Sequence, residues 1–72
     1  MDKEQLLKRF GKNVKIERIR QDLKQADVAE RLGIEQNYIA LIEIGRINMS
    51  LGKILELANA IGVHIEDLLK FK

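Results

Sequence analysis

The chain has 72 residues, enough for one domain with a single core, and a chain of this size buries only roughly 60% of the surface that its unfolded form exposes. Apolar residues make up 46% of the sequence and aromatic residues 4%, so aliphatic side chains must fill the core; cysteine and proline are absent. This composition excludes a disulfide framework, and the short apolar runs exclude a membrane-spanning helix and a secretion signal, so we expect a soluble cytoplasmic protein without metal or cofactor.

The net charge of +2 is unevenly distributed along the chain. Residues 1–24 carry eight basic and four acidic side chains, residues 25–49 carry two and four, and residues 50–72 carry three of each. A surface that binds phosphates is expected to be basic. The positive charge therefore lies on the first predicted helix and its exit, whereas the middle of the chain is slightly acidic.

The periodicity of the apolar residues predicts an all-α protein, because these residues recur at spacings of three and four rather than two. Asp2 and Ser50 are good N-caps, and Gly62 ends the fourth helix. The five predicted helices cover approximately residues 3–22, 25–32, 35–44, 51–61 and 64–70 of a single domain, 1–72. The inner side of the first helix is predicted to comprise Leu6, Leu7, Phe10, Val14 and Ile19.

The segment from Gln25 to Ile42 has the pattern of two short helices that cross at a steep angle. Gly33 ends the first of them, since glycine adopts the left-handed conformation of a tight turn without a steric penalty. Ala29 lies at the predicted crossing point, where a longer side chain would force the backbones apart. Ile34 is expected to be buried in the turn. The residues expected to form the shared core are Val28, Leu32, Ile39 and Ile42.

Six stretches of the chain together carry a family resemblance that needs no gaps. They are FGKNVK, Arg18, Leu23, QADVAERLGI, YIALIEIGR and SLGKILELANAIGV. From Phe10 to Leu69 the chain resembles the Cro/repressor-type (XRE-like) helix-turn-helix family, the five-helix DNA-binding domain of lambdoid phage repressors and restriction-modification controller proteins. The resemblance implies a bacterial or phage-encoded transcriptional regulator that binds a palindromic operator as a dimer. It leaves open whether the context is a phage, a toxin-antitoxin pair or a restriction-modification system.

The resemblance also implies that the third helix enters the major groove and that its first residues contact bases. Gln36 and Asn37 are then the first base-reading residues, and their amides suit the adjacent acceptor and donor on the major-groove edge of adenine. Leu41 lies one turn later, where apolar contact with a thymine methyl group is the direct readout open to it. An exposed leucine that packs locally is the alternative for this position.

The remaining site residues correspond to family positions close to the DNA backbone. Gln25 corresponds to a residue that touches a phosphate and braces the third helix, and Tyr38 is predicted to reach a phosphate. The residues expected to clamp phosphates are Lys24, Arg46 and Asn48. Arg18 and Glu43 correspond to a family pair in which a partly buried ion pair ties the first helix to the end of the third.

Five positions depart from the family pattern: Lys24, Glu35, Ile44, Ile47 and Met49. Lys24 stands where a capping Ser, Thr or Asn is usual, and a lysine side chain cannot accept a hydrogen bond. Ile44 and Ile47 replace polar or basic residues near the DNA backbone. They suggest an alternative function, a helix-turn-helix module that binds a protein through Leu41, Ile44 and Ile47.

The last predicted helix carries more apolar residues than a lone domain easily buries. The candidate residues for a homodimer interface are Ile65, Leu68, Leu69 and Phe71. His64 is the single histidine and is interpreted as a helix-start residue. No set of nucleophile, base and electrophile is apparent, so we do not expect an enzyme.

Overall fold

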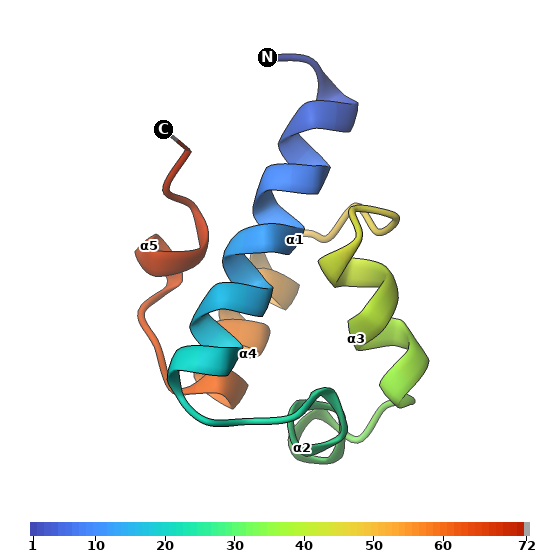
Figure 1. Cartoon of the computed structure of the whole chain (residues 1–72), viewed down its shortest axis with the longest axis vertical. Helices are drawn as coiled ribbons and strands as arrows, with labels where there is room; N and C mark the ends of the chain where they lie inside the picture. The colour runs from blue at the N-terminus through green and yellow to red at the C-terminus, as the bar shows by residue number, and fades with distance from the viewer. Residues whose placement is uncertain (72) are drawn as a thin grey trace.

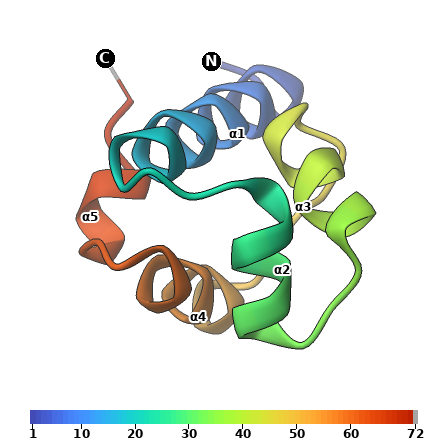
Figure 2. The same ribbon diagram turned by 60° about the horizontal axis from the view of Figure 1, so that its bottom comes forward.

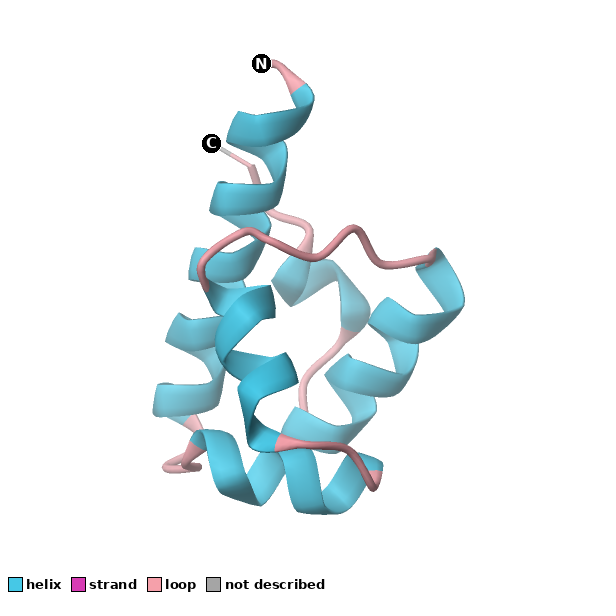
Figure 3. Cartoon of the chain, turned by 90° about the vertical axis from the view of Figure 1, so that its right-hand side faces the viewer, coloured by secondary structure: helices cyan, strands magenta, loops and turns pink. Residues whose placement is uncertain are grey.

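The structure is a computed structural model in which residues 1–71 are described. In this part of the chain every regular element is a helix, as Figure 3 shows. The prediction of an all-α fold with five helices is confirmed. The helices are α1 (Lys3–Arg20), α2 (Gln25–Leu32), α3 (Gln36–Glu43), α4 (Leu51–Ile61) and α5 (Ile65–Leu68).

The longest helix, α1, runs through the middle of the molecule, with α3 and α5 on opposite sides of it (Figure 1). Helix α4 packs against α2 and α5, and α2 packs against α3. Figure 2 shows α2 and α3 joined by a short loop and set at a steep angle to one another. The N-terminus and the end of the described chain lie at the same end of the molecule.

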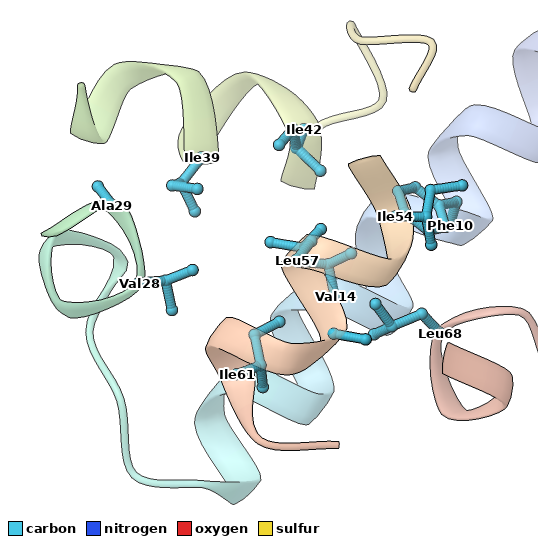
Figure 4. Packing of buried hydrophobic residues seen from close by; sticks show 11 residues of the cluster. Phe10, Val14, Val28, Ala29, Ile39, Ile42, Ile54, Leu57, Ile61 and Leu68 are labelled. Carbon is cyan, nitrogen blue, oxygen red and sulfur yellow. The ribbon is translucent and has the colours of Figure 1, made fainter. Parts of the chain in front are cut away.

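The core receives side chains from all five helices, which converge in Figure 4. Because each helix is amphipathic with apolar residues three and four apart, each contributes one stripe to this common centre. Val14, Val28, Ile39 and Leu57 are completely buried there. Leu68 is also 0% exposed, so its predicted place at a subunit interface is wrong. It contributes the side chain by which α5 is anchored to the core.

The first helix ends at Arg20, two residues before the predicted end. Asp22 adopts a left-handed conformation with φ of 58°, which turns the chain back so that Leu23 packs against the core. Two residues predicted for the inner side of this helix, Leu6 and Ile19, are exposed. The first turns of α1 project beyond the rest of the molecule (Figure 1), which leaves Leu6 partly uncovered. Ile19 is 56% exposed because it follows Arg18, which turns inward, and is therefore rotated away from the core.

The fifth helix is a single turn, shorter than predicted. Its first turn is capped by Asp67, whose carboxylate accepts a hydrogen bond from the backbone N–H of His64 at 3.1 Å. The Lys70 ammonium, 3.3 Å from this carboxylate, lowers the pKa of Asp67 below its ordinary value. Asn13 of α1 donates from Nδ2 to the carbonyl oxygens of Leu68 (3.0 Å) and Lys70 (2.9 Å). These bonds fix the C-terminal segment along α1 in place of a further helical turn.

Candidate nucleic-acid interface

The turn between α2 and α3 has the conformation that its glycine predicts. Gly33 is left-handed, with φ of 68° and ψ of 34°, and the backbone N–H of Ile34 donates to the carbonyl oxygen of Ala29 at 3.0 Å. Ala29 is 3% exposed in the core between the helices, as expected for a crossing point. Ile34 was expected to be buried but is exposed, because the turn directs it outward into a shallow hollow shared with Tyr38.

The N-terminus of α2 is capped by a residue inside the helix. Lys24 makes no side-chain cap, as the sequence predicts. Its backbone N–H instead donates to the carboxylate of Asp27, three residues later, at 2.7 Å. The side chain of Lys24 therefore plays no part in capping α2, and it is exposed at the start of this helix.

A buried polar network connects α1, α2 and the end of α3. Arg18 donates from Nε to Oε2 of Glu43 at 2.6 Å and from Nη2 to Oε1 at 3.0 Å. Its Nη1 donates to the carbonyl oxygen of Leu23 at 2.8 Å, and Nε2 of Gln25 donates to Oε1 of Glu43 at 3.0 Å. Arg18 and Glu43 are 9% and 8% exposed. The expected pairing of Arg18 with Glu43 is therefore present, and it fixes the orientation of α3 relative to both other helices.

The hydrogen bond to Glu43 raises the pKa of Arg18, and the charge of the carboxylate adds to this effect, while burial opposes it. Every polar side-chain atom that is fully buried in residues 1–71 has a hydrogen-bond partner. A bidentate pair of this kind is geometrically specific as well as strong. The network consequently holds the C-terminal end of α3 rigidly, while its N-terminal end points away from the core.

The predicted site residues lie on three neighbouring segments. Gln36 and Asn37 are exposed in the first turn of α3, and Leu41 follows one turn later, half-buried. Lys24 and Gln25 lie at the start of α2, the former exposed and the latter half-buried against Glu43. Arg46 and Asn48 are exposed in the loop after α3, and the backbone N–H of Arg46 donates to the carbonyl oxygen of Leu41 at 2.9 Å.

Tyr38 lies at the edge of the side of α3 that carries Asn37 and Leu41, three residues before Leu41. Its half-buried side chain packs against the core and lines the shallow hollow between α3 and α4, together with Ile34 and Lys53. Ile47 is also half-buried against the core. Of the three residues proposed for a protein-binding surface, only Ile44, 58% exposed, is strongly accessible.

The sequence interpretation missed an apolar groove between the start of α1, the start of α4 and the C-terminal segment. Leu51 is 70% exposed at its edge, and Leu55 is exposed one turn further along α4. The groove encloses about 200 Å³ and is lined by Leu6, Leu7, Phe10, Asn48, Met49, Leu51, Ile54, Leu69 and Phe71. The spacing of Leu51 and Leu55 could have signalled this second apolar face of α4, because both fall outside the stripe that fills the core.

Two steeply crossed helices with an exposed first turn on the second of them define a helix-turn-helix domain. A family model described as helix-turn-helix matches residues 14–68, and the chain belongs to this family of DNA-binding transcriptional regulators, of the XRE type. The predicted family is thereby confirmed. None of the helices in residues 1–71 has the length and apolarity needed to cross a bilayer.

Two solved structures are similar to this chain. One is the restriction-modification controller protein C.AhdI from Aeromonas hydrophila, with 32% sequence identity and a TM-score of 0.79 over 86% of this chain and 94% of that one. The other is a hypothetical transcription factor, NHTF, from Neisseria, with 27% identity and a TM-score of 0.82 over 97% of this chain and 80% of that one. No match was found among curated proteins.

Proposed function

We propose that the protein binds a palindromic DNA operator as a homodimer, with α3 of each subunit in the major groove. The observation that carries the proposal is the contrast between the two ends of α3. The buried Arg18–Glu43–Gln25 network fixes one end, and the amides of Gln36 and Asn37 are exposed at the other. A base-reading helix requires this combination, because hydrogen bonds to base edges depend on accurate placement of their donors and acceptors.

Direct base readout falls to the exposed side of α3. The amides of Gln36 and Asn37 each donate and accept, which matches the N6 donor and N7 acceptor of adenine. Leu41 offers a methyl-rich surface for a thymine methyl group in the same half-site. The half-site is therefore expected to contain A·T pairs opposite the first two turns of α3.

Phosphate contacts surround this helix. Gln25 uses one N–H of its amide for Glu43, and the second N–H is available to a phosphate oxygen. Lys24 adds a positive charge beside it, and Arg46 and Asn48 bind the backbone from the loop after α3. Tyr38 contributes its hydroxyl group to a phosphate from the edge of the helix.

The second subunit occupies the apolar groove beside α4. The groove includes Asn48 and Met49, so it continues directly into the loop that is proposed to bind phosphates. The exposed Leu51 lies next to it, and in a two-fold arrangement each Leu51 enters the groove of the other subunit. Leu69 and Phe71 line the groove, and Ile65, at the start of α5, packs against the core.

Such a dimer requires two operator half-sites about one helical turn, or roughly 34 Å, apart. Sedimentation equilibrium at micromolar concentration is expected to show a dimer that Leu51→Ser dissociates. Ile19→Ser is the matched control, because Ile19 is similarly exposed and does not line the groove. An equal effect of both substitutions would contradict this assignment of the interface.

Selection from a pool of random DNA duplexes at a fixed salt concentration tests the operator proposal. We expect enrichment of a palindrome whose half-sites have this spacing. Enrichment of no common sequence, under conditions in which the protein is folded, would overturn the proposed function.

A further inference from the structure

The helix proposed to enter DNA carries no positive charge, which poses an electrostatic problem. Residues 25–49 include two basic side chains, Arg31 and Arg46. Nη1 of Arg31 donates to the carbonyl oxygen of Ala60 on α4 at 2.8 Å, so this guanidinium belongs to the α2–α4 side of the molecule. Non-specific affinity for DNA derives mainly from neutralised phosphates. Beyond Lys24 and Arg46, further cations are therefore needed close to α3, and Ile44 directly after this helix cannot supply one.

Helix α1 is in close backbone contact with the exit of α3, the segment 42–45 that ends this helix and follows it. A Cβ atom on Gly11 would lie 2.5 Å from the carbonyl oxygen of Glu43 and would also clash with that of Ile42. A Cβ atom on Gly45 would lie 2.9 Å from the backbone nitrogen and Cα of Lys8. The backbones of α1 and of the α3 exit are thus in direct contact, with Gly11 at the crossing.

Two lysines of α1 flank this crossing. Lys8 and Lys15 lie three residues before and four residues after Gly11, which places both on the side of α1 that faces α3. Both are exposed. Lys12 neighbours both on the helix surface but lies further round from Gly11, where it borders a hollow with Asn13 and Lys70 next to α5. Lys12 is therefore turned further from α3 than Lys15 is, although the two are neighbours on one helix.

We propose that Lys8 and Lys15 bind DNA phosphates on either side of the exit of α3 and so add to the single positive charge that Arg46 supplies after this helix. This inference rests on the proposed function, since it requires α3 to lie in the groove. Lys8 makes an exposed ion pair with Glu4 at 3.1 Å, which it exchanges for a phosphate. Lys15 takes part in none of the ion pairs of residues 1–71, and it carries the stronger contact.

The salt dependence of binding to a duplex that carries the selected palindrome tests the proposal. Each phosphate contact contributes about 0.9 to the slope of log K against log salt concentration. Because a dimer contains two copies, Lys15→Gln is expected to reduce the magnitude of the slope by about 1.8. Lys12→Gln is the matched control, with the same change of charge on the same helix, and is expected to change the slope by less because Lys12 is turned further from α3.

Equal slopes for the Lys12→Gln and Lys15→Gln proteins, whether both reduced or both unchanged, would overturn the inference. Both substitutions are at exposed positions, and thermal melts establish that both variants are folded. Failure of the proposed function has a different signature, because the wild-type protein would then select no palindrome at all. Lys8→Gln is expected to reduce the slope in the same direction as Lys15→Gln.

Discussion

Removal of the Arg18 side chain is expected to be among the most damaging single substitutions in this protein. Arg18→Ala deletes three donors, to Oε1 and Oε2 of Glu43 and to the carbonyl oxygen of Leu23. Glu43 then remains as a carboxylate that is 8% exposed, with Gln25 as its one remaining side-chain partner in the network. A buried charge that has lost its counter-ion is poorly solvated, and this loss costs about 3 to 5 kcal/mol.

The same helix provides a matched control in Arg20. It also forms an ion pair, with Glu17 at 3.0 Å, but its side chain is 69% exposed. Exposed pairs contribute about 0 to 1 kcal/mol. Since 1 kcal/mol shifts Tm by about 4 to 8 °C in a domain of this size, Arg18→Ala should lower Tm by at least about 12 °C. Arg20→Ala should lower it by no more than about 8 °C.

Thermal unfolding followed by circular dichroism distinguishes these cases. Similar melting temperatures for Arg18→Ala and Arg20→Ala would refute the reasoning that loss of Arg18 leaves a buried, uncompensated charge on Glu43. The raised pKa of Arg18 keeps its guanidinium charged, so the effect of Arg18→Ala is the loss of a charged partner. Glu43→Gln should also destabilise the protein strongly, because it leaves the guanidinium of Arg18 buried without a counter-ion.

Three further substitutions test the packing of the helices. Gly11→Ala should prevent the close contact of α1 with α3 and lower the free energy of unfolding by more than about 1 kcal/mol. At Gly52 an added Cβ meets open space, so Gly52→Ala should stabilise the protein by about 0.5 to 1 kcal/mol. Equal urea midpoints for the two variants would contradict this. Asp27→Ala removes the acceptor for the backbone N–H of Lys24, the residue before α2, and should cost about 0.5 to 1.5 kcal/mol in urea unfolding. A loss no larger than that of Glu30→Ala would show that the bond is dispensable. Asn13→Ala should accelerate amide hydrogen exchange in the C-terminal segment, and unchanged exchange there would show that the two hydrogen bonds of its amide do not hold that segment.

Local signals were sufficient to predict the helix-turn-helix. Ala29 is required by the close crossing of α2 and α3, and Gly33 by the left-handed turn between them. Both features arise within one short stretch of sequence, so the local pattern was enough to predict them. Periodicity shows which side of a helix is apolar, but it does not show how far other helices cover that side. For this reason Leu6 is exposed although it was predicted to be buried, and Ile34 is exposed because the turn directs it outward.

Interactions between distant segments were less accessible from the sequence. Leu68 and Leu51 are both leucines on amphipathic helices, and only the fold shows that the first fills the core and the second borders a groove. The Arg18–Glu43 pair spans 25 residues and was indicated by the family resemblance and not by any local pattern. Which of Lys12 and Lys15 is turned more toward α3 likewise depends on where α3 and α5 pack.

The central claim is that α3 reads bases while the residues around it bind the backbone. The most direct test is the binding affinity of Gln36→Ala and Lys24→Ala for the selected operator and for each of its single-base variants. We expect Gln36→Ala to lose discrimination at one position in each half-site and Lys24→Ala to weaken binding to all sequences equally. A uniform loss of affinity for Gln36→Ala, with discrimination unchanged at every position, would contradict the account.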